Sequence, residues 1–163
     1  MEIERKFLVN EDELLTEINL NNYNKYSIEQ AYISTEDREV RIRKIENSYS
    51  KSKCFMTIKS KDDLVRKEVE FEIPYNKYQD LISLKMYKGN IINKLRYKVP
   101  LENGLIAEID IYRQQLFGLV MVEVEFKTEE EAQLFQKPNW FGEEVTNNNK
   151  YKNRKLATDI HRV

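Results

Sequence analysis

The sequence is poor in the residues on which several common kinds of site depend. It has one cysteine, Cys54, and one histidine, His161, among 163 residues. A disulfide framework and a multi-cysteine metal site are therefore excluded. A single histidine near the end of the chain supports neither a histidine-based triad nor a histidine metal centre. The glycine motifs of P-loop and dinucleotide-binding folds are absent as well, so those folds are unsupported.

Long apolar runs and an excess of one charge are also missing. No apolar stretch approaches the roughly 20 residues that cross a bilayer, and residues 1–9 lack the apolar core of a secretory signal. We therefore expect a cytoplasmic protein without a membrane partner. The 27 Lys and Arg residues balance 28 Asp and Glu residues, which argues against a dedicated nucleic-acid binder because such proteins carry a basic excess.

Only four glycines and three prolines occur, with no low-complexity linker and no internal repeat. The sequence therefore predicts one domain over residues 1–163. Apolar and polar residues alternate strictly along most of it, which indicates strands with two different faces. The predicted strands are residues 2–9, 26–34, 39–46, 53–59, 67–73, 91–99, 105–113 and 119–126. Short helices are expected at about 10–20, 76–84, 128–135 and 151–156.

Charged side chains fall on one face of nearly every predicted strand, because successive side chains point to opposite faces. The basic members are Lys6, Arg41, Arg43, Lys59, Lys94 and Arg96; the acidic ones are Glu2, Glu4, Glu68, Glu70, Glu72, Glu108, Asp110, Glu123 and Glu125. A solvated outer face is the ordinary interpretation of any one such strand. Rows of like charge need a compensating partner, however. The pattern across many strands thus favours a sheet whose charged face points inward, with basic strands facing acidic ones.

These residue types suit a phosphate-rich ligand and a metal. Arginines offer planar forks for phosphate oxygens, and lysines add point charges. Carboxylates without histidine or cysteine favour a hard cation, so we expect Mg²⁺ or Mn²⁺ rather than zinc. Bound phosphates and a divalent cation are the parts that phosphoryl transfer needs.

The ordered motifs resemble the CYTH superfamily, the triphosphate tunnel metalloenzymes. The opening Glu2-Ile3-Glu4-Arg5-Lys6 is similar to the E-x-E-x-K signature of that family. Val40 to Arg43, Thr57-Ile58-Lys59, Lys94-Leu95-Arg96, Glu108-Ile109-Asp110, Glu123-Val124-Glu125 and Trp140 to Thr146 follow in the family's order. The resemblance covers essentially the whole chain. It implies an α+β, mainly β fold: an eight-stranded antiparallel β-barrel, or tunnel, with a charged interior and a few helices outside.

The resemblance also implies roles for individual residues. The metal ligands would be Glu2, Glu4, Glu70, Glu72, Asp110, Glu123 and Glu125. The triphosphate would be bound by Lys6, Arg41, Arg43, Lys59, Arg66, Lys94, Arg96 and Lys150. Glu4 and Lys6 would be catalytic: a metal-activated water attacks phosphorus, and Lys6 polarises the phosphate or orders that water.

Three functions remain open at this stage. The first is hydrolysis of a triphosphate by a monomer or homodimer, with tripolyphosphate expected ahead of ATP and thiamine triphosphate. A stacking indole in the tunnel is not expected, because Trp140 is the sole tryptophan and lies late in the chain. The second is a class IV-type adenylate cyclase, which converts ATP to cyclic AMP and pyrophosphate. The third is a non-catalytic module that binds polyphosphate or a nucleotide.

Overall fold

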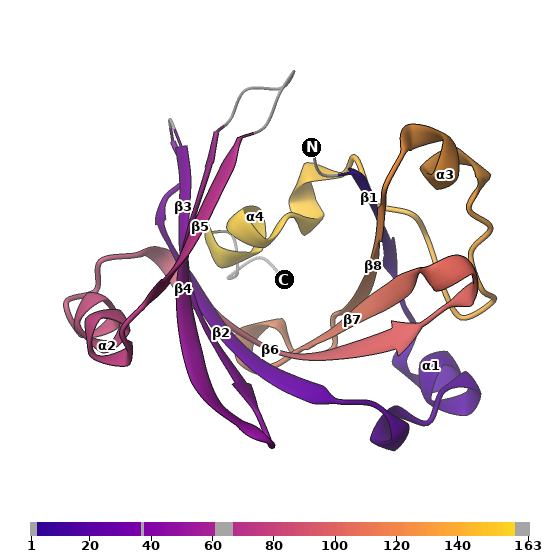
Figure 1. Cartoon of the computed structure of the whole chain (residues 1–163), viewed down its shortest axis with the longest axis horizontal. Helices are drawn as coiled ribbons and strands as arrows, with labels where there is room; N and C mark the ends of the chain where they lie inside the picture. Colours follow the sequence, from indigo (N-terminus) through magenta and orange to yellow (C-terminus); the bar gives the residue numbers. More distant parts are fainter. Residues whose placement is uncertain (1–2, 37, 61–66, 159–163) are drawn as a thin grey trace.

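The structure, a computed structural model, describes residues 3–36, 38–60 and 67–158 (Figure 1). The strands are β1 (Ile3–Leu8), β2 (Lys25–Ser34), β3 (Arg38–Asn47), β4 (Ser50–Ser60), β5 (Glu68–Ile73), β6 (Lys88–Pro100), β7 (Ile106–Tyr112) and β8 (Val120–Phe126). The α-helices are α1 (Glu11–Glu17), α2 (Tyr75–Ser83), α3 (Glu129–Leu134) and α4 (Asn153–Thr158). Within these residues no helix is both long and apolar enough to cross a bilayer.

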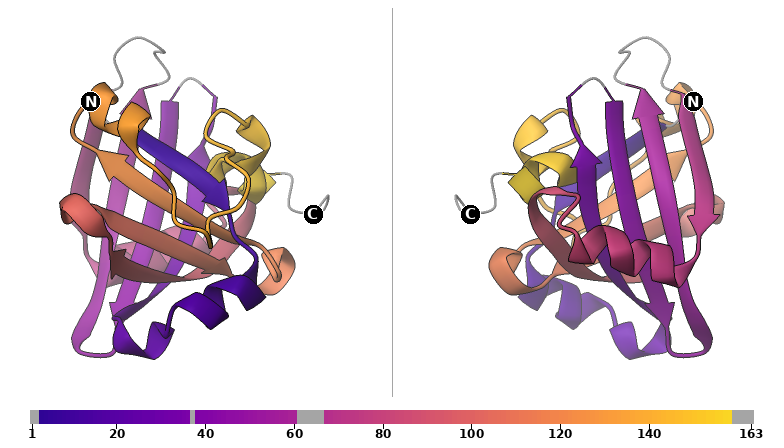
Figure 2. Two further views of the ribbon diagram at one scale, coloured as in Figure 1. Left: turned by 90° about the vertical axis from the view of Figure 1, so that its right-hand side faces the viewer. Right: turned by 90° about the vertical axis from the view of Figure 1, so that its left-hand side faces the viewer.

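The eight strands form one antiparallel sheet in the order β1-β8-β7-β6-β2-β3-β4-β5. The sheet bends so that β3, β4 and β5 face β1 and β8 across a floor of β2, β6 and β7 (Figures 1 and 2). Eight antiparallel strands with α1, α2 and α3 on the outside confirm the predicted architecture.

Closure of the sheet by hydrogen bonds is one part of the fold prediction that the structure contradicts. Among the described residues, β1 and β5 form no ladder with each other. The free edge of β1 is covered instead by the segment 142–146, in which Val145 N–H donates to Lys6 O (2.8 Å) and Leu8 N–H donates to Glu143 O (2.8 Å). Because that segment already satisfies the backbone groups of β1, the sheet ends there.

Local sequence explains where two of the helices begin. The Asn10 side chain accepts from Glu13 N–H at the start of α1, and Thr128 accepts from Glu131 N–H at the start of α3. Both helices carry three acidic residues in the first turn, which complement the positive end of the helix dipole. The helices predicted at about 10–20 and 128–135 begin at these two capping residues.

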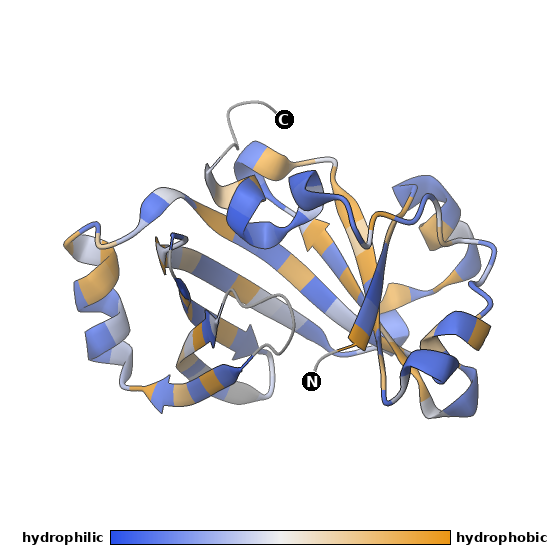
Figure 3. Cartoon of the chain, turned by 90° about the horizontal axis from the view of Figure 1, so that it is seen from above, coloured by the Kyte–Doolittle hydropathy of each residue, from blue (hydrophilic) through white to orange (hydrophobic). Residues whose placement is uncertain are grey.

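The apolar faces of the strands point mainly away from the cavity that the sheet encloses. One outer cluster joins β1, β7 and β8 to α1, α3 and Trp140, and a second joins β2, β3 and β4 to α2. Hydrophilic and hydrophobic positions accordingly alternate along the strands (Figure 3). The expected inversion, with charge inside and apolar packing outside, therefore holds for most of the sheet.

Helix α4 departs from the expectation that all helices lie outside. Its Leu156 and Ala157 are buried against Tyr32, Ile92 and Tyr112, on the concave side of the sheet. Gly89 permits this approach: its φ is +67°, and a Cβ there would overlap the carbonyl oxygen of Ala157 and lie 2.9 Å from its carbonyl carbon. A residue with a side chain at position 89 would collide with backbone.

Candidate active site

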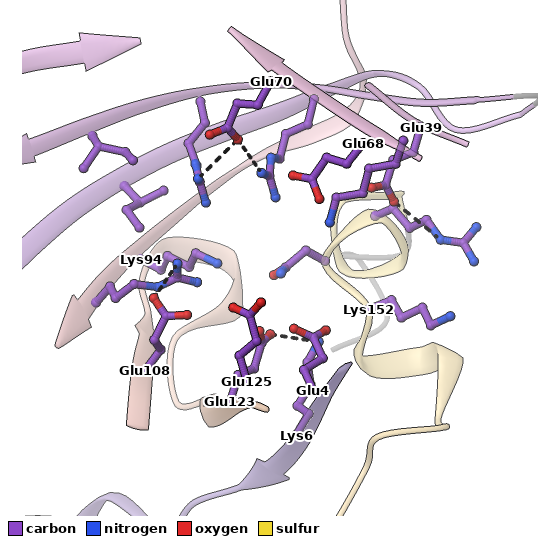
Figure 4. Close-up of a pocket in the computed structure, with 18 of the residues that line it drawn as sticks. Glu4, Lys6, Glu39, Glu68, Glu70, Lys94, Glu108, Glu123, Glu125 and Lys152 are labelled. Carbon is purple, nitrogen blue, oxygen red and sulfur yellow. Dashed lines mark hydrogen bonds and ion pairs between the residues drawn. The ribbon is translucent and has the colours of Figure 1, made fainter. Parts of the chain in front are cut away.

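The concave side of the sheet encloses a cavity of about 450 Å³ whose walls are mostly charged (Figure 4). Every strand except β4 and β7 contributes at least two lining side chains, those two contribute one each, and residues in and next to α4 line one side. The lining includes nine basic residues, Lys6, Arg41, Arg43, Lys59, Lys94, Arg96, Lys98, Lys152 and Arg154, and seven acidic residues, Glu4, Glu39, Glu68, Glu70, Glu108, Glu123 and Glu125. Charges of both signs thus meet in one enclosed space.

Most of the side chains predicted to bind triphosphate lie together in this cavity. The six that line it are Lys6, Arg41, Arg43, Lys59, Lys94 and Arg96. Lys150 does not line it; its Nζ lies 5.4 Å from the ring centroid of Tyr151, and Lys152 lines the cavity instead. Arg66 lies outside the described residues.

The predicted metal ligands divide into three groups. Glu4, Glu70, Glu123 and Glu125 line the cavity. Glu72 and Asp110 do not, and Glu2 lies outside the described residues. In Figure 4, Glu4, Glu123 and Glu125 gather on one side of the cavity, and Glu68 and Glu70 lie across from them.

Two arginines and a carboxylate are held together on the β3–β5 wall. Glu70 Oε2 lies 3.8 Å from Arg41 Nη2 and 4.0 Å from Arg43 Nη2, and it accepts a 2.7 Å hydrogen bond from the Thr57 hydroxyl. Burial first, and then the positive charges of Arg41 and Arg96, lower the pKa of Arg43 to about 10. The guanidinium therefore stays charged at neutral pH, in surroundings that an added anion would stabilise.

On the opposite wall, Lys6 pairs with Glu123. Their Nζ and Oε1 atoms are 3.2 Å apart, and Lys6 Nζ also donates to Tyr151 O (3.2 Å). Burial alone would raise the pKa of Glu123, but the positive charges of Lys6, Arg96 and Lys94 together outweigh burial and lower it. Glu123 is therefore ionised and available as an oxygen ligand at neutral pH.

A third charged group lies between β6 and β7. Asp110 accepts from Arg96 through Nε (2.7 Å) and Nη2 (2.9 Å), and its Oδ2 lies 2.8 Å from Lys94 Nζ. Burial lowers the pKa of Lys94 to about 8, even though Asp110 opposes the shift. Arg96 and Lys94 in turn outweigh burial at Asp110 and hold its pKa well below the ordinary value.

The sequence motifs missed several lining residues. Lys98 lies two residues after Arg96 on β6, and Glu39 lies two residues before Arg41 on β3, so each shares the inward face of its strand. Both could have been found from the alternation of side chains along those strands. Lys152 and Arg154 could not be found in this way, because they belong to no strand. Arg154 Nε lies 3.8 Å from Glu39 Oε1, which ties α4 to β3.

Several known proteins are similar to this chain over nearly its whole length. The chain is 37% identical to an inorganic triphosphatase of Nitrosomonas europaea, over 98% of each chain. It is 32% identical to an inorganic triphosphatase of Acetivibrio thermocellus, covering 99% of this chain and 96% of that one. Among solved structures, the inorganic triphosphatase NE1496 superposes with a TM-score of 0.68 at 34% identity, over 97% of this chain and 95% of that one.

A Hippeastrum protein, HpAC1, shares the fold with a TM-score of 0.61 at 17% identity, over 82% of this chain and 83% of that one. Such low identity supports the fold alone. The family model for the CYTH domain matches residues 1–162. The chain belongs to the CYTH domain family.

Proposed function

We propose that this chain is a divalent-metal-dependent triphosphatase that hydrolyses inorganic tripolyphosphate. The observation that carries the proposal is the cavity, in which nine basic side chains surround carboxylates that approach from two sides. Two relatives above 30% identity are named inorganic triphosphatases and match nearly the whole chain. A small, highly charged substrate suits a space of this size and polarity.

The basic side chains bind and orient the phosphates. Arg41 and Arg43 approach from β3, Lys94 and Arg96 from β6, and Lys6 from β1. Triphosphate oxygens placed between these walls would receive charge-assisted hydrogen bonds from several directions. Such positioning, together with stabilisation of charge on the oxygens, supplies most of the catalysis in phosphoryl transfer.

The acidic side chains fit a hard divalent cation. Glu4, Glu123 and Glu125 supply only oxygen donors, and the cavity lining includes no histidine or cysteine, which suits Mg²⁺ or Mn²⁺. Within the described part of the chain, no three acidic side chains already form a metal cage. That agrees with the usual Mg²⁺ arrangement, in which one or two carboxylates share the ion with substrate phosphates and water. When bound, the ion would polarise a phosphoryl oxygen and make a water molecule more nucleophilic.

In the reaction, a water oxygen attacks the terminal phosphorus and the bridging P–O bond breaks. Pyrophosphate carries away the bond's electron pair, and the water proton passes to solvent or to a carboxylate. In this proposal Glu4 orients that water, and Lys6 donates hydrogen bonds to the phosphoryl oxygens. Thiamine triphosphate is not favoured as the substrate, because Trp140 is buried in the outer cluster and does not line the cavity.

The test is release of phosphate from tripolyphosphate, ATP and thiamine triphosphate with Mg²⁺ or Mn²⁺, with cyclic AMP measured in parallel. Glu4→Gln removes a cavity carboxylate and should lower tripolyphosphate turnover at least 100-fold. Glu17→Gln makes the same chemical change on the exposed end of α1 and should leave turnover unchanged. Cyclic AMP formation from ATP would replace the proposal with a cyclase, and tight binding without turnover would replace it with a binding module.

A further inference from the structure

Asp110 differs from the other acidic residues of the site because it is enclosed and its carboxylate contacts three charged donor groups. Its side chain is 4% exposed, and it does not line the cavity. We infer that Asp110 is a positioning residue, which fixes Lys94 and Arg96 for triphosphate binding and does not bind the metal. The inference rests on the proposed function, which it deepens by assigning a role within the same site.

The hydrogen bonds of Asp110 leave little capacity for a cation. Oδ1 accepts from Arg96 Nε at 2.7 Å. Oδ2 accepts from Arg96 Nη2 at 2.9 Å and lies 2.8 Å from Lys94 Nζ. Three of roughly four lone-pair positions of the carboxylate are therefore used by charged donors. A metal ion at Asp110 would have to displace an arginine or a lysine from a carboxylate that does not line the cavity.

The two cations, unlike Asp110, do line the cavity. The two-point contact to Asp110 fixes the plane of the Arg96 guanidinium, and Glu108 Oε2 lies 3.4 Å from Nη1 on the other side. The Lys94 side chain is 1% exposed, and its Nζ lies 5.5 Å from the ring centroid of Tyr112. The orientations of both cations are thus set before any substrate arrives, which lowers the entropy cost of binding.

Glu70 provides a contrast within the same cavity. It also pairs with two cations, Arg41 and Arg43, but at 3.8 and 4.0 Å, and its side chain is 38% exposed. Glu70 therefore keeps access to an incoming cation, whereas Asp110 does not. Two acidic residues on inward strand positions have different roles, and burial together with the number of donors distinguishes them.

Removal of the Asp110 charge distinguishes the positioning role from an effect of the net charge of the cavity on anion binding. Counted as charge alone, Asp110→Asn makes the cavity more positive and should strengthen binding of an anion. Under the positioning role it weakens binding, because Lys94 is left as an unpaired buried cation and Arg96 loses its two-point contact. The direction of the change therefore discriminates between the two accounts.

The experiment measures two constants for the wild type and Asp110→Asn. One is the KM for tripolyphosphate at saturating Mg²⁺; the other is the Mg²⁺ concentration for half-maximal rate at saturating tripolyphosphate. We expect KM to rise at least tenfold while the Mg²⁺ constant changes less than twofold. Glu123→Gln is the comparator, and there the Mg²⁺ constant should rise. A raised Mg²⁺ constant with unchanged KM in Asp110→Asn would make Asp110 a metal ligand and overturn the inference, as would no change in either constant.

Two further measurements cover failure to fold and failure of the proposed function. If Asp110→Asn does not fold, Asp110→Glu keeps the charge but displaces it, and the same rise in KM is expected; an unchanged KM overturns the inference. If the wild type releases no phosphate, the proposed function fails, and calorimetric binding of tripolyphosphate without metal becomes the readout. At least tenfold weaker binding by Asp110→Asn upholds the positioning role, and equal or tighter binding overturns it.

Discussion

Replacement of Gly89 by alanine tests how closely α4 packs on the sheet. A non-glycine residue in the left-handed region costs about 1–2 kcal/mol, and the φ of Gly89 is +67°. The added Cβ would also meet the backbone of Ala157 and lie 2.9 Å from the Cα of Thr158, so α4 would have to move. Loss of the burial of Leu156 adds roughly 1.5–3 kcal/mol. We therefore expect the free energy of unfolding, measured in urea, to fall by about 2.5–5 kcal/mol.

Gly104 offers a matched control. Its φ is +75°, and a Cβ there would have no neighbour within 4 Å. Gly104→Ala should therefore cost only the backbone term of about 1–2 kcal/mol. Because Asn153 and Arg154 on α4 line the cavity, Gly89→Ala should also raise the KM for tripolyphosphate, whereas Gly104→Ala should not. Equal losses of stability in the two variants would refute the close packing of α4 against β6.

Three further results follow from the site. The lowered pKa of Lys94 is about 8, so its ammonium loses its proton above that pH. The KM for tripolyphosphate should therefore rise between about pH 8 and pH 9.5. Lys94→Met should raise KM at every pH and abolish this pH-dependent rise. Arg5 donates to the carbonyls of Ala132 (2.8 Å) and Phe135 (3.3 Å) outside the cavity. Arg5→Ala should therefore lower the free energy of unfolding by about 1–3 kcal/mol, measured by urea titration. The Mg²⁺ concentration for half-maximal rate should stay unchanged. Chelation with EDTA should abolish turnover but leave the circular dichroism spectrum and melting temperature unchanged, because the three apolar clusters need no metal.

The strands and the inward face could be predicted because both are local properties of sequence. Period-two alternation places Arg41 and Arg43 on one face and Ile42 on the other, and in the structure Ile42 is fully buried while both arginines line the cavity. The capping side chains of Asn10 and Thr128 are local in the same way. Such signals need no knowledge of which strands become neighbours.

The parts that were missed depend on contacts between distant segments. The alternation of side chains along β7 puts Asp110 on the same face as the cavity residues. The long side chains of Lys94 and Arg96 from the neighbouring strand nevertheless enclose it. Nothing in the alternation of β7 distinguishes Asp110 from Glu108. The entry of α4 into the concave side likewise depends on Gly89, which lies more than 60 residues before that helix.

The pairing of β1 has a consequence for the order in which the protein folds. The neighbours of β1 in the sheet are β8 and the segment 142–146, so its partners begin more than 110 residues further along the chain. Contacts between residues so far apart in the sequence have a large entropy cost of loop closure, so they form late in folding. Glu4 and Lys6 therefore join the cavity only after β8 has been synthesised and is in place. The walls of β2, β3 and β6, which carry Arg41, Arg43, Lys94 and Arg96, can form earlier, and β1 completes the cavity last.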